Sequence, residues 1–129
     1  MTEIPDGYED LLIRPLIGHL ATVRPDGQPA VTPMWFGWDG EVLKFTHTNR
    51  RAKFRNIEAT PYVAMSVVDP DQPYRYLQAR ARVESVEPDP TGSYYVELSR
   101  RYGNVDPPPP PDSPDRVIIT ARPFAYSKQ

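Results

Sequence analysis

The residues of this sequence best suited to chemistry form a basic cluster between positions 50 and 55. Its four cations are Arg50, Arg51, Lys53 and Arg55, in a chain of formal net charge −2. At the start of a helix these cations would repel one another and oppose the helix dipole. A phosphate docked at the helix N-terminus would reverse both penalties, because backbone N–H groups, the dipole and the cationic side chains would all bind it. The alternative is a solvated basic face that pairs with surface carboxylates.

Polar residues just before the cluster add further candidates. Thr46 and Thr48 carry short hydroxyl groups, and His47 lies between them at the end of an expected strand. His47 is therefore the better site candidate of the two histidines. The other, His19, alternates with apolar residues, so we expect it at a hydrogen-bonded core or interface position.

A second candidate segment is Pro33-Met34-Trp35-Phe36. A proline inside a strand removes a donor from the hydrogen-bond ladder and indicates an edge or a bulge. Methionine and two aromatic residues beside free backbone groups would give a planar heterocycle a stacking surface and hydrogen bonds to its edge. The alternative is that Met34 and Phe36, two residues apart, share a core face while Trp35 and Gly37 point away from it.

Composition disfavours several other chemistries. The chain has no cysteine and two histidines among 129 residues, which leaves no thiolate or disulfide and little for a zinc site or a catalytic triad. No Walker, G-x-G-x-x-G or G-x-S-x-G motif is present. The negative net charge disfavours binding to nucleic acid or to an anionic membrane surface. Redox or group-transfer chemistry would therefore depend on a bound cofactor, and we expect no metal.

Aspartates in the proline-rich loops lack the glycine-and-glutamate pattern of a calcium loop. We expect them to be solvated turn formers. They are Asp69, Asp71, Asp112 and Asp115.

The elements that position the candidate residues are mostly β-strands. Six strands are expected, over 17–24, 29–38, 41–47, 62–68, 76–86 and 116–126. The first three are predicted to form an antiparallel meander, with a hairpin turn at Asp39-Gly40. Helices are expected near the N-terminus, over 50–59, and after Asp89, which would cap the third helix. The sequence thus predicts one domain over residues 1–129, a mainly β, antiparallel Greek-key barrel with two or three short helices.

No targeting or membrane segment is evident in the sequence. The first ten residues are acidic and polar, and no apolar window approaches the roughly 18 residues that a membrane helix needs. We therefore expect a soluble, cytoplasmic protein.

The order of these parts resembles a known family. Residues 20–69 open with L-A-T-V-R-P-D-G and include Pro33-Met34-Trp35, and the block R-R-A-K-F-R-N precedes a P-Y-V strand. This run resembles the pyridoxamine 5'-phosphate oxidase-like superfamily of split β-barrels, and within it the actinobacterial enzymes that use the deazaflavin coenzyme F420. The likeness continues through Pro73-Tyr74-Arg75-Tyr76-Leu77 and the strand that follows. It implies a six-stranded, FMN-binding-like split barrel.

The resemblance assigns the phosphate end of a cofactor site. Arg51 and Lys53 would hold the cofactor phosphate. Arg55 and Asn56 would brace the helix start or reach the acidic tail of the cofactor. The channel for the phosphate and ribityl groups would be lined by Thr46, His47 and Thr48.

The resemblance also assigns the ring end of the site and a second subunit. The backbone of one segment would contact the edge of the deazaflavin ring, namely Thr32, Pro33, Met34 and Trp35. In this family the site lies between the subunits of a homodimer, so Tyr74 and Tyr76 of the partner could close it.

The implied activity is that of an oxidoreductase that transfers a hydride from reduced F420 to an unsaturated or quinone-like small molecule. FMN in the same fold, acting as a flavin reductase or oxidase, is one alternative, and a cofactor-binding protein without turnover is another. An excess of arginine over lysine and a total of 17 prolines favour F420. The chain has no counterpart of the C-terminal pyridoxal-phosphate-binding segment of the oxidase, so vitamin B6 oxidation is not expected.

Overall fold

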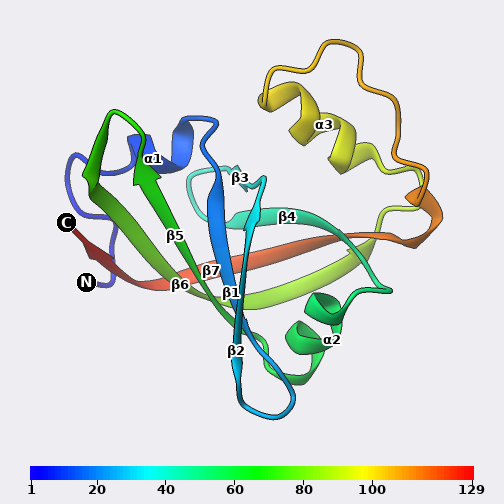
Figure 1. The fold of residues 1–129 in the computed structure, drawn as a ribbon, viewed down its shortest axis with the longest axis horizontal. Coiled ribbons are helices and arrows are strands. Elements are labelled where there is room, and N and C mark those ends of the chain that lie inside the picture. Colours follow the sequence, from blue (N-terminus) through cyan, green and yellow to red (C-terminus); the bar gives the residue numbers. More distant parts are fainter.

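The computed structural model describes all 129 residues as one curled antiparallel sheet with short helices (Figure 1). Its elements are α1 (Asp10–Ile13), β1 (Gly18–Val23), β2 (Pro29–Met34), β3 (Gly37–Trp38), β4 (Leu43–Thr48), α2 (Ala52–Ala59), β5 (Tyr62–Asp69), β6 (Gln72–Pro88), α3 (Ser93–Arg101), a 3-10 turn (Ser113–Asp115) and β7 (Arg116–Lys128). The strand order is β2-β1-β5-β6-β7-β4-β3. The mainly β, split-barrel fold predicted from the sequence is confirmed.

The expected strand over 29–38 is in fact two strands, which is why the sheet has seven strands rather than six. β2 ends at Met34 and β3 begins at Gly37, and the two lie at opposite ends of the strand order. The predicted meander is therefore wrong at this point. Phe36, between the two strands, is fully buried, and its N–H donates to the Tyr102 hydroxyl (3.1 Å) instead of to a neighbouring strand.

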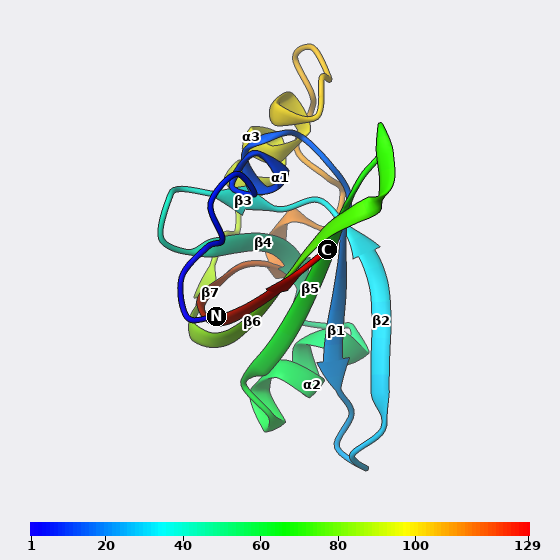
Figure 2. The ribbon, with the colours of Figure 1, turned by 90° about the vertical axis from the view of Figure 1, so that its left-hand side faces the viewer.

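The core lies within the curl of the sheet. It contains 17 buried apolar residues, including Leu11 and Leu12 of α1. The alternation predicted for 76–86 is confirmed, because Leu77, Ala79 and Ala81 are buried while Arg80 and Arg82 are exposed. Helices α1 and α2 lie at opposite ends of the barrel (Figures 1 and 2). None of the helices has the length and apolar character needed to cross a bilayer.

β2 is an edge strand that pairs only with β1. It begins with Pro29 and contains Pro33, in keeping with the confinement of proline to strand edges. The Arg24 N–H donates to the Gln28 carbonyl (2.8 Å), and from this pair onwards every second residue of β2 directs its N–H and carbonyl towards β1. That alternation turns the backbone groups of Pro29, Val31 and Pro33 towards the open edge.

Helix α3 and the chain that follows it project from the barrel (Figures 1 and 2). The Asp89 carboxylate accepts hydrogen bonds from the N–H groups of Ser93 (3.2 Å) and Tyr94 (2.9 Å), so its predicted capping contact is present, but the N-cap position belongs to Gly92 and the predicted start at Pro90 is wrong. The helix itself begins at Ser93, after Gly92, whose φ of +67° suits glycine. Residues 104–111, which contain five consecutive prolines, are here called the proline arch.

Two side chains at the end of α3 fix it to the barrel. The Arg101 guanidinium donates to the carbonyl oxygen of Phe36 (3.0 Å). It also donates, at 3.0 Å each, to the carbonyls of Leu12, Ile13 and Arg14 at the end of α1. Tyr102 donates its hydroxyl proton to the Leu16 carbonyl (2.6 Å). Carbonyl groups left without partners at the end of α1 thereby accept hydrogen bonds from Arg101, which holds α3 against the barrel.

The loop aspartates expected to be solvated all form ion pairs; the expectation is wrong for buried Asp69, whereas the Asp71 side chain is exposed. The pairs are Asp69–Arg75, Asp71–Arg14, Asp112–Arg116 and Asp115–Arg50, at 2.8–2.9 Å. Asp69 departs furthest from the expectation, because it is 4% exposed. Arg14 and Arg50 are distant in sequence from the aspartates that they pair with, so local composition could not reveal these two pairs.

Candidate functional site

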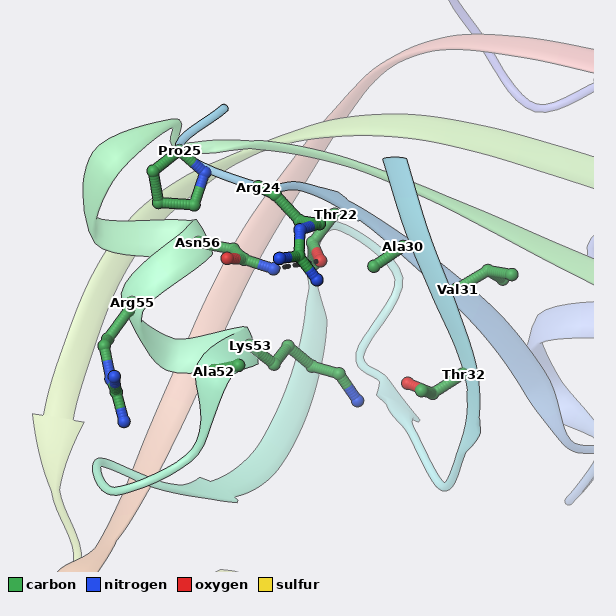
Figure 3. A pocket seen from close by; sticks show the side chains of 10 residues that line it. All are labelled: Thr22, Arg24, Pro25, Ala30, Val31, Thr32, Ala52, Lys53, Arg55 and Asn56. Atoms are coloured by element: carbon green, nitrogen blue, oxygen red, sulfur yellow. Dashed lines mark hydrogen bonds between the residues drawn. The ribbon is translucent and has the colours of Figure 1, made fainter. Parts of the chain in front are cut away.

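A groove of about 330 Å³ runs between the β1–β2 hairpin and the N-terminal half of α2 (Figure 3). The hairpin lines it with Thr22, Arg24, Pro25, Ala30, Val31 and Thr32. Helix α2 lines it with Ala52, Lys53, Arg55 and Asn56. Three of the ten lining residues are cations and none is acidic. The groove is therefore suited to an anion.

Lys53 is the cation that enters this groove most directly. Figure 3 shows its side chain extended from α2 towards β2. Its ammonium group lies 3.1 Å from the Met34 sulfur, a weak acceptor that leaves the charge uncompensated. Burial, with a smaller contribution from Arg51, lowers the pKa of Lys53 below its usual value of 10.5. A half-buried cation held in this way is stabilised when an anion joins it.

The other cations of the basic cluster have different surroundings. Arg50 forms a salt bridge with Asp115 (2.8 Å), so the alternative of surface pairing holds for this residue. Arg55 donates to the Arg50 carbonyl (3.2 Å), and Figure 3 shows it pointing away from β2. Arg51 is exposed and forms no salt bridge. Lys53, Arg51 and Arg55 thus all lack an acidic partner, and of these three Lys53 is the one that extends towards β2.

The N-terminus of α2 is itself uncapped. Its N-cap residue is Arg51, with no side-chain hydrogen bond to the first turn and no acidic residue within that turn. Free N–H groups and the positive end of the helix dipole therefore add to the charges of Arg51 and Lys53. This is the donor set that a phosphate group requires.

Asn56 has a structural role beside this helix terminus. It is 5% exposed, and its side-chain amide donates to the Thr22 hydroxyl (3.1 Å). The bond ties α2 to β1 across the floor of the groove, and both residues line the groove. The sequence missed Thr22 and Arg24 as groove residues, because only the folded hairpin brings them opposite α2.

The residues of β4 that precede the cluster are buried but do not line the groove. Thr46 accepts a hydrogen bond from Arg116 (3.4 Å), and Thr48 is 4% exposed. His47 is 6% exposed, and its Nε2 atom has no hydrogen-bond partner. Burial, followed by the charges of Lys53 and Arg51, lowers the pKa of His47 from 6.5 to about 4. His47 is therefore neutral at pH 7 and lies within the field of the same cations.

The four residues from Thr32 to Trp35 lie in different environments. Thr32 lines the groove, and Pro33 belongs to the open edge of β2. Met34 packs against the core near Lys53, so the alternative of a shared core face for Met34 and Phe36 is confirmed. Trp35 instead stacks on Tyr102 of the α3 end, with ring centroids 5.2 Å apart and planes 12° apart.

Tyr74 and Tyr76 lie far from the groove within one chain. They begin β6, at the tip of the β5–β6 hairpin, and both views place this tip at the opposite end of the barrel from α2 (Figures 1 and 2). Tyr74 is 85% exposed. A contact of either residue with the groove therefore needs a second subunit, as the family resemblance implies.

His19 is exposed in the single chain rather than buried in its core. The expectation of a core position is wrong, because β1 turns His19 and its neighbour two residues away, Ile17, outwards. An interface position for His19 stays a prediction.

Fold and groove together define a split β-barrel protein with a cationic groove beside the uncapped start of its second helix. The chain belongs to the pyridoxamine 5'-phosphate oxidase family, whose sequence profile matches residues 4–128. It is similar to a structure of an F420 reductase, with 63% identity, a TM-score of 0.95 and coverage of 98% of this chain and 100% of that one.

More distant structures share the fold alone. A conserved hypothetical protein from Mycobacterium tuberculosis is 23% identical, with a TM-score of 0.72 over 92% of this chain and 79% of that one. General stress protein 26 from Bacillus anthracis is 21% identical, with a TM-score of 0.68 over 92% and 88%. Comparison with curated proteins finds no match.

Proposed function

We propose that the protein is an oxidoreductase that binds coenzyme F420 in the groove and reduces an unsaturated or quinone-like small molecule. The uncompensated charge of Lys53 at the uncapped start of α2 carries this proposal. The 63% identity to an F420 reductase supports it. FMN presents a similar phosphate to the same donors and is the alternative cofactor.

The residues of the groove fit the cofactor as a set of donors for a phosphate. Lys53, Arg51 and the free N–H groups of α2 would hold the phosphate, while Thr32 to Trp35 would lie along the ring. When bound, reduced F420 supplies two electrons and a proton as a hydride, and the substrate takes its second proton from solvent or from a side chain.

The chain itself contributes binding, orientation and exclusion of water. Asn56 and Thr22 fix the helix that carries Lys53, and stacking on Tyr102 fixes Trp35. His47, whose pKa is lowered by burial and by these cations, adds no charge of its own at neutral pH. No group among these is required to form a covalent bond with the substrate.

The proposal includes a homodimer in which the partner completes the site. Tyr74 is 85% exposed on a projecting hairpin, where it could reach a second copy. Tyr62 (50% exposed) and Phe124 (43% exposed) add apolar area on the outer face of the sheet. Sedimentation of the purified protein should show a dimer, and a monomer at micromolar concentration would contradict a shared site.

The decisive experiment is a titration of the purified protein with F420 and with FMN, followed by fluorescence. We expect one of the two cofactors to bind tightly, and no fluorescence change with either cofactor would overturn the proposal. Lys53→Ala should weaken binding by about 10- to 100-fold, equal to about 1.5–3 kcal/mol for a charge-assisted hydrogen bond. Arg50→Ala is the matched control, because Arg50 is already neutralised by Asp115 and its loss should change affinity less than threefold. Measuring substrate reduction by the protein loaded with reduced cofactor then distinguishes an enzyme from a cofactor-binding protein without turnover.

A further inference from the structure

Lys53 differs in its surroundings from the other two lysines of this chain. Its ammonium group lies 3.1 Å from the Met34 sulfur and forms no salt bridge. Lys44, by contrast, lines a cavity together with two acidic residues. Lys128 is exposed, and its ammonium group lies 5.2 Å from the centre of the Tyr8 ring. The chain therefore holds one lysine in a cationic environment and two that serve as internal standards for it.

The environment of Lys53 favours the reactive form of its amine. An amine is a nucleophile only when it is neutral. Burial and the neighbouring charge of Arg51 lower the pKa of Lys53 below 10.5, so a larger fraction of this side chain is neutral at pH 7 than in an ordinary lysine. Desolvation beside another cation is one of the ways in which proteins activate a lysine as a nucleophile.

The groove determines which electrophiles reach this amine. Arg24 and Arg55 line it together with Lys53, and no acidic residue does, so a compound that carries a phosphate is concentrated there by charge. Figure 3 shows the Lys53 side chain extended from α2 towards the part of β2 that carries Thr32. In an acyl phosphate, a single oxygen atom joins the reactive carbonyl carbon to the phosphorus. A phosphate bound in the groove therefore brings the carbonyl carbon within reach of the amine.

The groove also suits the product of an acyl transfer. Small and apolar side chains contribute to its lining, namely Pro25, Ala30 and Ala52, and the methyl of an acetyl group can lie against them. An acylated lysine is neutral, which removes the repulsion from Arg51, the unfavourable interaction with the dipole of α2 and the cost of a half-buried charge. The tie between α2 and β1 is made by Asn56 and Thr22, so the fold does not depend on the lysine charge.

We propose that Lys53 is a site of acylation by acyl phosphates, and that the modification removes the charge with which the groove binds an anion. The ammonium group first loses one proton to solvent. The neutral amine then attacks the carbonyl carbon, an N–C bond forms, and the C–O bond to the phosphate breaks with its electron pair on the departing oxygen. The second proton of the amine leaves with the product, hydrogen phosphate. Acylation itself does not depend on the proposed function, whereas its effect on the cofactor does.

Acetyl phosphate is the probe for the first test. The cofactor-free full chain is incubated with it at pH 7.5, and the initial rate of acetylation at each lysine is measured by quantitative mass spectrometry of peptides. Lys53 should react at least tenfold faster than Lys44 and Lys128. Inorganic phosphate should slow the reaction at Lys53 at least threefold and leave the other two lysines unchanged. Equal rates at the three lysines, or no protection by phosphate, would overturn the proposal.

Two arginine variants and an uncharged reagent test whether the phosphate is recruited. Arg51→Gln should slow acetylation of Lys53 at least fivefold, because it removes both a neighbouring charge and a donor for the phosphate. Arg50→Gln is the matched control and should change the rate less than twofold, since Asp115 already neutralises Arg50. With uncharged p-nitrophenyl acetate, the preference for Lys53 should be smaller than with acetyl phosphate. The same preference with both reagents would show that binding of the phosphate plays no part.

A last comparison measures the consequence for the cofactor. Protein acetylated at Lys53 and the uncharged variant Lys53→Gln should both bind F420 at least tenfold more weakly than the unmodified protein. Lys53→Arg keeps the charge and cannot be acetylated, and it should bind F420 within fivefold. Undiminished binding of F420 to the acetylated protein would contradict the proposed loss of anion binding. Failure of F420 and FMN to bind the unmodified protein would instead overturn the proposed function, and the acetylation rates would still decide whether Lys53 is an acylation site.

Discussion

The groove at α2 and the cavity between α3 and the proline arch, here called the arch pocket, are of similar size but differ in the charge of their lining residues. The groove, of about 330 Å³, has three cationic side chains and no acidic one. The arch pocket, of about 400 Å³, has five prolines and no charged side chain. The two cavities therefore differ in the charge of their lining, which is positive in the groove and neutral in the cavity beside α3.

The two regions also differ in how they are held. Helix α2 is tied to β1 by a side-chain hydrogen bond between Asn56 and Thr22, and its N-terminus is left uncapped. The arch and α3 are held by Arg101 and Tyr102 through several hydrogen bonds to backbone carbonyls. The start of α2 thus keeps its donors free, whereas the donors at the end of α3 are used within the fold.

The largest expected effect comes from removing the clamp that holds α3. Arg101→Ala deletes four hydrogen bonds from one guanidinium and leaves carbonyl oxygens without donors. We expect the free energy of unfolding to fall by about 4 kcal/mol, measured by urea denaturation. The neighbouring Arg100→Ala is the control, since Arg100 is exposed. A loss of less than about 1 kcal/mol for Arg101→Ala would show that α3 is held by other contacts.

The next effect concerns pH and belongs to the groove region. Folding lowers the pKa of His47 from its ordinary value of 6.5 to about 4, so the unfolded chain takes up the proton first as the pH falls. The associated stability is fully present above about pH 6.5 and is lost between pH 6.5 and 4, by up to about 3 kcal/mol.

A comparison with His47→Gln isolates this contribution. The difference in unfolding free energy between the two proteins, followed by denaturant titrations from pH 7.5 to 4, should shift in favour of the variant as the pH falls. His19→Gln is the matched control, because His19 is exposed and its substitution should leave the profile unchanged. A constant difference between wild type and His47→Gln across this range would mean that His47 titrates normally.

The smallest effect should be a gain in stability. Lys53→Met removes a half-buried cation whose near neighbour is a thioether. The free energy of unfolding should rise by less than about 1 kcal/mol, since solvent screens part of the cost of the charge. Arg50→Met should not show this gain, because it loses the salt bridge to Asp115. A loss of stability in Lys53→Met would indicate that the lysine stabilises the fold and is not reserved for a ligand.

Much of the fold follows from local patterns in the sequence, and the failures have a common cause. The alternation of β6 and the capping by Asp89 were predictable, because each depends on residues a few positions apart. The break at Trp35 and Phe36 was not, since the apolar sequence continues through it. The break depends on a hydrogen bond from Phe36 to Tyr102, 66 residues later, which no local pattern encodes.

The same division applies to the candidate site. The basic cluster was visible because its charges are adjacent in sequence, and the uncompensated state of Lys53 required the structure. Arg24 and Thr22 face α2 only after the hairpin folds. Tyr95 lies beside Trp35 only because the fold places α3 against this segment.

The prolines of β2 bear on how copies of this protein meet. Along the open side of this strand, Pro29 and Pro33 occupy two of the three outward-facing positions, so Val31 alone presents an amide hydrogen there. A strand from another molecule would find acceptors without matching donors and could not extend the sheet. Edge-to-edge association of copies through β2 is thereby disfavoured. Copies of the chain would instead have to associate through other surfaces of the barrel.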